Sequence, residues 1–64
     1  MFTGTVKFFN VKNKFGFVKC NEDGKEYYVH AKNVEGELLN QNDYVQFELK
    51  DTKRGPEAVQ VKKV

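Results

Sequence analysis

Short runs in which apolar and polar residues alternate extend through the whole chain. Five of these runs, rich in Val, Phe and Tyr, are predicted to be β-strands: Gly4–Asn10, Phe15–Cys20, Glu26–His30, Tyr44–Lys50 and Glu57–Lys63. The stretches NVKNK, NEDGK, VEGELLNQND and DTKRGPE separate them and contain residues typical of turns. No run has a sustained helical period, although AKNVEGELL has room for a single helical turn.

A chain of 64 residues buries a small apolar core, because a domain of this size covers only about 60% of the surface that its unfolded chain exposes. An open sheet would also leave unpaired backbone groups along its edge strands, and closing the sheet into a barrel removes these edges. We therefore expect an all-β fold: a five-stranded antiparallel closed barrel in which residues 1–64 form a single domain. No internal repeat or linker suggests a second one.

The second run sets two phenylalanines beside a lysine. Successive side chains of a strand point to opposite faces, so Phe15, Phe17 and Lys19 share one face. A lysine ammonium stays in water, and this face is therefore expected to be the outer one. Val18 and Cys20 then point into the core.

The third run gives the same result. Glu26 marks the face that it shares with Tyr28 and His30 as the exposed one. Leaving a large ring in water forfeits about 1.5–3 kcal/mol of burial free energy, so an external ligand is expected to cover these rings. The alternative places the rings in the core, but it buries Glu26 and Lys19 or breaks the register of both strands.

A separate set of apolar residues is available for the core. In the fourth run one face carries Val45, Phe47 and Leu49. The opposite face carries Tyr44, Gln46 and Glu48. Val45, Phe47 and Leu49 are expected to pack with valines from the other segments, namely Val6, Val18, Val29, Val34, Val59 and Val61.

Positive charge is concentrated near the start of the chain. The net charge is +2, but residues 1–20 hold four lysines and no acid, whereas residues 21–64 hold seven basic and nine acidic side chains. Exposed rings between lysines are typical of proteins that bind single-stranded nucleic acid, because unpaired bases stack on rings and phosphates attract ammonium groups. A set of lysines that merely solvates the surface is the alternative.

Four blocks of the sequence resemble one family in the same order and at the same spacing. They are GTVKFFN, KFGFV, YYVHA and KRGPEA, and over nearly the whole chain they resemble the bacterial cold-shock proteins and the cold-shock domain. The resemblance implies an oligonucleotide/oligosaccharide-binding (OB) fold. It also implies binding of single-stranded RNA and DNA, with activity as an ATP-independent RNA chaperone or as a regulator of transcription or translation.

The resemblance implies seven binding positions, to which the flanking lysines Lys14 and Lys19 are added. Phe8 stands where the family usually has tryptophan. Counting by twos from Lys7 would expose Phe9 instead, so a bulge is expected in the first strand. The residues expected to bind nucleic acid are Lys7, Phe8, Lys14, Phe15, Phe17, Lys19, Tyr28, His30 and Arg54.

The chain also departs from the family pattern. Asn13 and Lys14 replace Lys-Gly before the FGF block, and we expect Asn13 to adopt the positive φ of the missing glycine while Lys14 contacts phosphate. Ala31 replaces the last phenylalanine of the second motif, and the 34–43 connection is shorter than usual and lacks its aromatic residue. Both changes predict fewer base subsites and weaker binding. Tyr27 replaces a core valine, and its hydroxyl requires a partner at the barrel rim.

No enzyme, cofactor or metal site is predicted. His30 has no companion acid, nucleophile or set of metal ligands, and Cys20 is the single cysteine. Arg54 is expected either to contact phosphate or a base, or to be simply solvated. A small-barrel module that binds peptides through the aromatic patch is the alternative function, but acidic residues are expected around such a groove and this chain has lysines there.

The sequence also bears on location and partners. Lys7 precedes any apolar run of useful length, and no segment approaches the roughly 20 apolar residues of a membrane span. We expect a cytoplasmic protein with no membrane association and no obligate protein partner.

Overall fold

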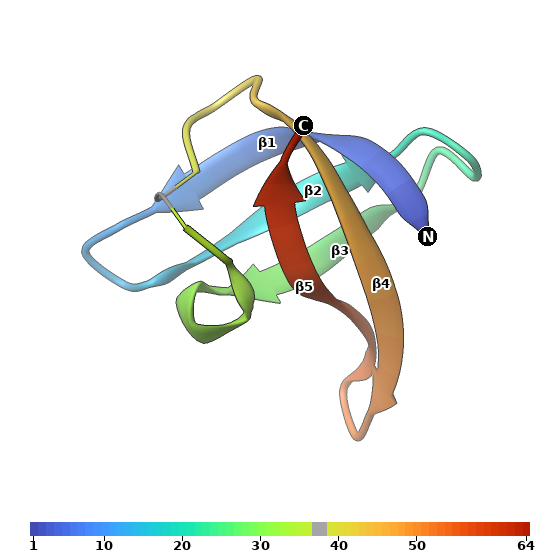
Figure 1. Cartoon of the computed structure of the whole chain (residues 1–64). Helices are drawn as coiled ribbons and strands as arrows, with labels where there is room; N and C mark the ends of the chain where they lie inside the picture. Colours follow the sequence, from blue (N-terminus) through green and yellow to red (C-terminus); the bar gives the residue numbers. More distant parts are fainter. Residues whose placement is uncertain (37–38) are drawn as a thin grey trace.

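Across the described residues, 1–36 and 39–64, the computed structural model shows a closed barrel of five strands (Figure 1). The strands are β1 (Phe2–Asn10), β2 (Phe15–Cys20), β3 (Glu26–His30), β4 (Tyr44–Thr52) and β5 (Gly55–Lys63), and a 3-10 turn, η1 (Ala31–Asn33), follows β3. The five predicted strands are confirmed, with β1, β4 and β5 longer than expected. The predicted helical turn is η1; residues 37–38 of the same stretch lie outside the described part.

One seam of the barrel is parallel. The strand order is β1-β2-β3-β5-β4, and β4 returns to pair with β1. Four of the pairings are antiparallel, but β3 and β5 are parallel, with Val29 opposite Ala58. The prediction of a wholly antiparallel barrel was therefore wrong. A closed ring with an odd number of strands cannot alternate direction throughout, so one neighbouring pair must run the same way.

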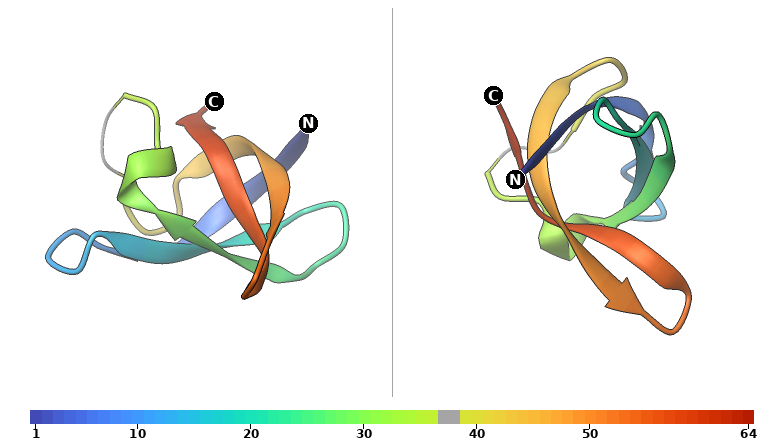
Figure 2. Two further views of the ribbon diagram at one scale, coloured as in Figure 1. Left: turned by 90° about the horizontal axis from the view of Figure 1, so that it is seen from below. Right: turned by 90° about the vertical axis from the view of Figure 1, so that its right-hand side faces the viewer.

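The barrel is small and strongly curved. Figure 2 shows the strands winding around a common centre, with the turn between β4 and β5 projecting at one end. The N-terminal half of β1 pairs with β4, and β2 pairs with both β1 and β3. The β1-β2-β3 sheet is therefore continuous, and any surface that it presents combines side chains from all three strands.

The core is formed mainly by the inward residues of every strand. Its buried members are Val6, Val18, Cys20, Tyr27, Val29, Leu39, Val45, Phe47, Ala58 and Val61. Phe2, Phe9, Val34 and Leu49 pack against this cluster from partly buried positions. The phenylalanines of β2 are not among them, so the core is filled without the rings that the alternation places outside.

Two core positions differ from the predictions. Val59 is only partly buried, because a register shift in the β4/β5 pair accompanies a φ of 52° at Gln60 and makes Ala58 and Val61 the inward residues. Leu39 is 2% exposed although it lies in a polar connection. Strand alternation gives no signal for an isolated leucine of this kind.

Tyr27 is buried on β3 and its hydroxyl has a partner at the rim of the barrel. It donates a hydrogen bond to Oδ2 of Asp23 in the β2–β3 turn, which confirms the expected requirement. The other oxygen of Asp23 accepts from the backbone N–H of Lys25 at 2.8 Å. The bond to Asp23, together with burial, raises the pKa of Tyr27 to about 12, and the same bond lowers the pKa of Asp23.

This hydrogen bond predicts a pH-dependent contribution to stability. The pKa of Tyr27 in the folded chain, about 12, lies above its ordinary value of 10.0. The stabilisation is therefore fully present below pH 10 and is lost as the pH rises through 12. Tyr27→Phe should lower the melting temperature at neutral pH, and the difference from the unmodified chain should shrink in strong alkali. Thermal unfolding followed by circular dichroism measures both, and a difference independent of pH would contradict the assignment.

Candidate nucleic-acid interface

Four aromatic rings form a continuous cluster on the outside of the β1-β2-β3 sheet. Phe17 lies 5.5 Å from Phe8 and 6.0 Å from Tyr28 between ring centroids. Phe15 lies 6.3 Å from Phe17 and stacks on Tyr28 at 5.8 Å, with 20° between the ring planes. Phe8 is 40% exposed and the other three are partly exposed. We call these four residues the aromatic face.

Strand register brings the four rings together. Across the β2/β3 pair, Phe17 is opposite Tyr28 and Phe15 is opposite His30, so these side chains share the outer face. The structure therefore confirms the predicted outward direction of Phe15 and Phe17. The competing placement of these rings in the core is wrong.

A bulge in β1 brings Phe8 to the same face. The register passes from Val6 opposite Val18 directly to Phe8 opposite Phe17, which leaves Lys7 as the extra residue. Lys7 and Phe8 are consequently both exposed, whereas Phe9 turns toward the core. The irregularity expected from the family resemblance is confirmed, and simple alternation would have placed Phe9 outside.

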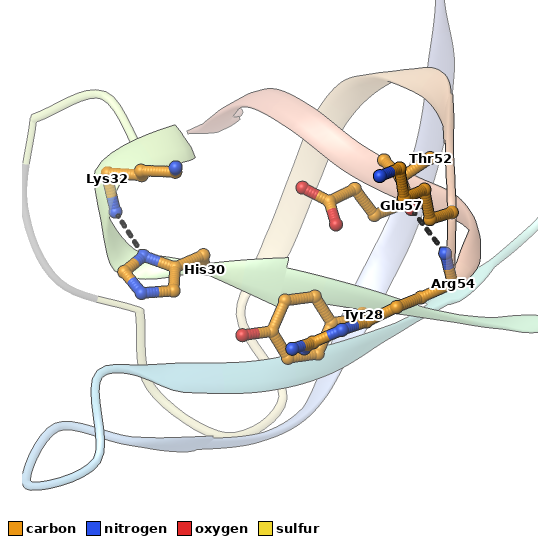
Figure 3. A pocket seen from close by; sticks show the side chains of 7 residues that line it. Tyr28, His30, Lys32, Thr52, Arg54 and Glu57 are labelled. Atoms are coloured by element: carbon orange, nitrogen blue, oxygen red, sulfur yellow. Dashed lines mark hydrogen bonds between the residues drawn. The ribbon is translucent and has the colours of Figure 1, made fainter.

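A cavity of about 260 Å³ adjoins the Tyr28 end of the aromatic face. Its lining comes from β3, η1 and the β4–β5 hairpin: Tyr28, His30, Lys32, Thr52, Lys53, Arg54 and Glu57 (Figure 3). Arg54 thus lies in the same cavity as Tyr28 and His30, although Arg54 and His30 are 24 positions apart in the sequence. We call this the His30 cavity.

Hydrogen bonds fix the orientation of groups around the His30 cavity. Nδ1 of His30 accepts from the backbone N–H of Lys32 at 3.1 Å, so in the neutral ring Nε2 carries the proton and is the donor. The hydroxyl of Thr52 accepts from the N–H of Arg54 at 3.2 Å and donates to the Gly55 carbonyl at 2.6 Å, which holds the hairpin turn. These contacts leave side-chain donors and a cationic guanidinium beside the aromatic rings.

The sequence did not indicate four members of this cavity. Lys32, Thr52, Lys53 and Glu57 come from segments that no strand pattern joins, and the cavity forms where η1 meets the hairpin. A signal was present for Lys53 and Glu57, since both lie in the KRGPEA block, one residue before and three residues after Arg54. The carboxylate of Glu57 points into the space between η1 and the hairpin (Figure 3). It accepts a hydrogen bond from Nδ2 of Asn33 at 3.4 Å.

A second cavity, of about 290 Å³, lies beside the opposite end of the sheet. Its lining combines strand residues with the segment before β4: Thr5, Val6, Lys7, Lys19, Glu26, Gln41 and Asn42. The ammonium of Lys7 is 2.6 Å from Oε2 of Glu26, and Lys19 is the cross-strand neighbour of Glu26. We call this the Lys7 cavity. Two of the three predicted lysines, Lys7 and Lys19, are therefore brought together here with a carboxylate that the sequence analysis used only to identify the solvent-exposed face.

The turn between β1 and β2 corrects one prediction. Lys14, not Asn13, adopts the positive φ, at 62°. The side-chain oxygen of Asn10 accepts from the N–H groups of Lys12 and Asn13 at 3.0 and 3.1 Å, which holds the first part of the turn. Lys14, the residue in the left-handed region, lies immediately before β2. Its carbonyl accepts a hydrogen bond from the backbone N–H of Ala31 at 2.9 Å.

The conformation of Lys14 predicts opposite effects on stability and binding. A side chain at this φ is strained by about 1 kcal/mol relative to glycine, so Lys14→Gly should raise the free energy of unfolding by up to about that amount. If Lys14 contacts phosphate, the same change should flatten the salt dependence of nucleic-acid binding by about 0.7 decades per decade of salt. Urea unfolding and binding titrations measure the two effects.

Lys12→Gly is the matched control, because it removes a charge from the same turn at a residue whose φ is not positive. It should not stabilise the fold. Equal stabilisation by both changes would exclude backbone strain at Lys14 as the cause.

The surroundings of Cys20 are those expected for a core side chain. Cys20 is buried, its thiol donates to Oε1 of Glu22 at 3.4 Å, and burial raises its pKa, all of which fits a core residue. Within residues 1–36 and 39–64, no group of three or more His, Cys, Asp or Glu side chains is arranged to hold a metal ion. In the same part of the chain, no helix has the length and apolar character needed to span a membrane.

Comparison with known sequences supports the resemblance over the full length. The family described as the 'cold-shock' DNA-binding domain matches residues 2–64. The cold shock-like protein CspLB of Listeria monocytogenes is 42% identical over 67 residues, covering 100% of both chains. CspD of Bacillus cereus is 39% identical over 98% of both chains, and the major cold shock protein of Micrococcus luteus is 34% identical over 100% of both.

A solved structure shares the fold. Drosophila Unr CSD456 superposes on 98% of this chain with a TM-score of 0.81, at 23% sequence identity. This chain spans 26% of that longer one. The superposition supports a shared fold.

Proposed function

The chain belongs to the cold-shock DNA-binding domain family, whose general activity is nucleic-acid binding, and we propose that it binds single-stranded RNA and DNA on the aromatic face. The proposal includes an OB-type barrel acting as one domain over residues 1–64 and a role as an ATP-independent RNA chaperone. One observation carries it: four partly exposed rings from three strands form one cluster between two cavities that contain basic side chains.

Stacking supplies the selectivity for single strands. A base stacked on an aromatic side chain contributes about 1–3 kcal/mol, largely irrespective of which base it is. The four rings do not all lie in one plane, because Phe15 and Phe17 meet edge to face with 84° between their planes. Successive bases must therefore turn relative to one another to stack on them. A single strand can adopt such a path, whereas a duplex keeps its bases stacked on each other.

Chaperone activity would follow from this mode of binding. A protein that holds unpaired segments by stacking favours the unpaired form of RNA by mass action, without a nucleotide cofactor. Because stacking depends little on which base is present, the same site could bind many different transcripts. The proposed contact residues are those predicted from the sequence: Lys7, Phe8, Lys14, Phe15, Phe17, Lys19, Tyr28, His30 and Arg54.

A competition titration tests this function. A labelled pyrimidine-rich single strand of about seven nucleotides should bind, while duplex of the same length should compete poorly. With four cationic side chains in the proposed set, affinity should fall by roughly 2–3 decades per decade of added salt. Equal affinity for duplex would contradict the proposal. Salt-independent binding of proline-rich peptides in place of nucleic acid would favour the protein-interaction alternative.

A further inference from the structure

Basic side chains gather at one end of the aromatic face. The turn between β1 and β2 carries Lys12 and Lys14, and the carbonyl of Lys14 accepts from the backbone N–H of Ala31, the first residue of η1, at 2.9 Å. Figures 1 and 2 show this turn and η1 on the same side of the barrel. η1 adds Lys32 and the β4–β5 hairpin adds Lys53 and Arg54, all of which line the His30 cavity. We call these five residues the basic end: Lys12, Lys14, Lys32, Lys53 and Arg54.

The cations of the basic end are exposed, and acidic side chains do not neutralise them. Among the described residues, no carboxylate lies within ion-pair distance of any of the five, whereas Lys7 pairs with Glu26 at 2.6 Å. Glu57 is the one carboxylate among the described residues that line the His30 cavity, and it accepts from the neutral amide of Asn33. The basic end therefore keeps its positive charge available for an anion that arrives from solvent.

The stacking surfaces stop where the basic end begins. The β1–β2 turn (residues 11–14), η1 and the tip of the hairpin (residues 52–56) contain no Phe, Tyr or Trp. Phe15 directly follows the β1–β2 turn, and His30 directly precedes η1. A nucleotide that lies beyond these rings finds cations for its phosphate but no flat surface for its base.

The turn at the other end of β2 is acidic. It carries Glu22 and Asp23 with one lysine, Lys25. Hydrogen bonds from Thr3 to Glu22 and from Tyr27 to Asp23 lower the pKa of both carboxyl groups, so both are ionised at neutral pH. The six residues of β2 separate this turn from the basic end by about 20 Å, roughly twice the screening length of about 10 Å at 0.1 M salt. The two ends therefore act on phosphates independently.

We propose that the basic end binds the phosphates of nucleotides that continue past the aromatic face, by charge alone and without stacking their bases. This inference rests on the proposed function. It adds Lys12, Lys32 and Lys53 to Lys14 and Arg54, which are already in the proposed contact set. The ligand that it implies is a strand longer than the segment on the rings, held by its bases at the rings and by its backbone beyond them. Because one end alone is basic, the backbone is held on one side of the stacked segment.

An extension that lacks bases tests the inference. Fluorescein-labelled heptathymidylate is compared with the same strand lengthened by a short run of abasic nucleotides at its 5′ end or at its 3′ end. The abasic units carry phosphates but cannot stack, so they create no new positions for the stacked segment. One of the two extended strands should bind about threefold to tenfold tighter at low salt, and its salt dependence should steepen by about 0.7 decades per decade for each phosphate neutralised. The other should bind no more tightly than heptathymidylate.

Lys12→Gln combined with Lys32→Gln removes two of the added cations. Both side chains are exposed, so the variant should remain folded, which circular dichroism checks. It should lose most of the gain from the extension, while its affinity for heptathymidylate should fall by less than about threefold.

Lys25→Gln combined with Lys62→Gln is the matched control. It removes the same charge from two exposed lysines, one in the β2–β3 turn and one on β5, that line neither cavity. The control should keep the gain from the extension. Equal losses from both double variants would reduce the effect to net charge and overturn the inference.

The heptathymidylate titration separates this inference from the proposed function. If heptathymidylate binds but neither extension adds affinity, or both add the same, the inference is overturned and the function stands. Failure of the unmodified protein to bind heptathymidylate would remove the function and the inference with it.

Discussion

Replacing Phe15 and Phe17 together by alanine is expected to weaken single-strand binding by at least about thirtyfold. Each ring offers a stacking surface for a base, worth about 1–3 kcal/mol, and two are removed. Both rings also pack against Phe8 and Tyr28, so their loss removes support from the rest of the aromatic face. Titration with a labelled pyrimidine-rich strand measures the change directly.

A tyrosine outside the aromatic face supplies the control for the double alanine variant. Tyr44 on β4 is 50% exposed and has no ring contact with the four residues of the cluster, so Tyr44→Ala should leave binding nearly unchanged. Phe15→Leu with Phe17→Leu retains apolar volume without flat rings, and it keeps the test decisive if the alanine variant unfolds. Folded variants of either kind that bind as tightly as the unmodified protein would refute stacking on β2.

Gly16→Ala is expected to produce the largest loss of stability from adding one methyl group. A Cβ at residue 16 would lie 2.3 Å from the carbonyl oxygen of Phe8 and 2.7 Å from Cα of Phe9. Both obstacles are backbone atoms, so no change of rotamer can relieve the clash, and β1 must move away from β2. Overpacking of this kind costs about 1–3 kcal/mol, and we expect the upper end of that range. Urea unfolding gives the value.

Gly24→Ala separates this clash from the general cost of losing a glycine. A Cβ at Gly24 meets no atom within 4 Å, although its φ of 73° imposes some strain. Its destabilisation should therefore stay near 1 kcal/mol. Because Phe8 is displaced with β1, Gly16→Ala should also weaken nucleic-acid binding even where the chain remains folded. A Gly16→Ala protein as stable as Gly24→Ala would show that β1 and β2 do not approach so closely.

Much of the fold was predictable because short strands alternate side chains strictly. Lys19 and Glu26 identified the wet faces of β2 and β3, and this was enough to place Phe15, Phe17 and Tyr28 outside. The same rule failed wherever a strand is irregular. Val59 was placed in the core because alternation ignores the bulge at Gln60, and the direction of Phe8 followed from the family resemblance and not from the pattern.

Other features depend on contacts that local sequence does not encode. The parallel β3/β5 seam follows from closing an odd number of strands, a property of the whole ring. The positive φ falls at Lys14, one residue later than predicted, in a turn whose first part is held by the side chain of Asn10. Leu39 is buried in the core although it belongs to a polar connection. The His30 cavity is lined by segments that are distant in sequence.

The departures at Ala31 and in the 34–43 connection predict a site with fewer base subsites than a complete family member has. Ala31 begins η1 and offers no ring beside His30. Part of the connection, residues 37–38, lies outside the described residues, and its other residues carry no aromatic side chain. We expect the chain to bind a heptanucleotide more weakly than full-motif members do. Parallel titration against such a protein under one buffer condition measures the difference.

The central claim is that unpaired bases stack on the aromatic face. An NMR titration of the aromatic ring protons with a pyrimidine heptanucleotide tests it most directly, because a stacked base shifts the resonances of the ring beneath it. The account predicts large shifts at Phe8, Phe15, Phe17 and Tyr28, small shifts at Tyr44, and no comparable change with duplex of the same length. Shifts confined to residues outside the aromatic face, or equal shifts with duplex, would contradict it.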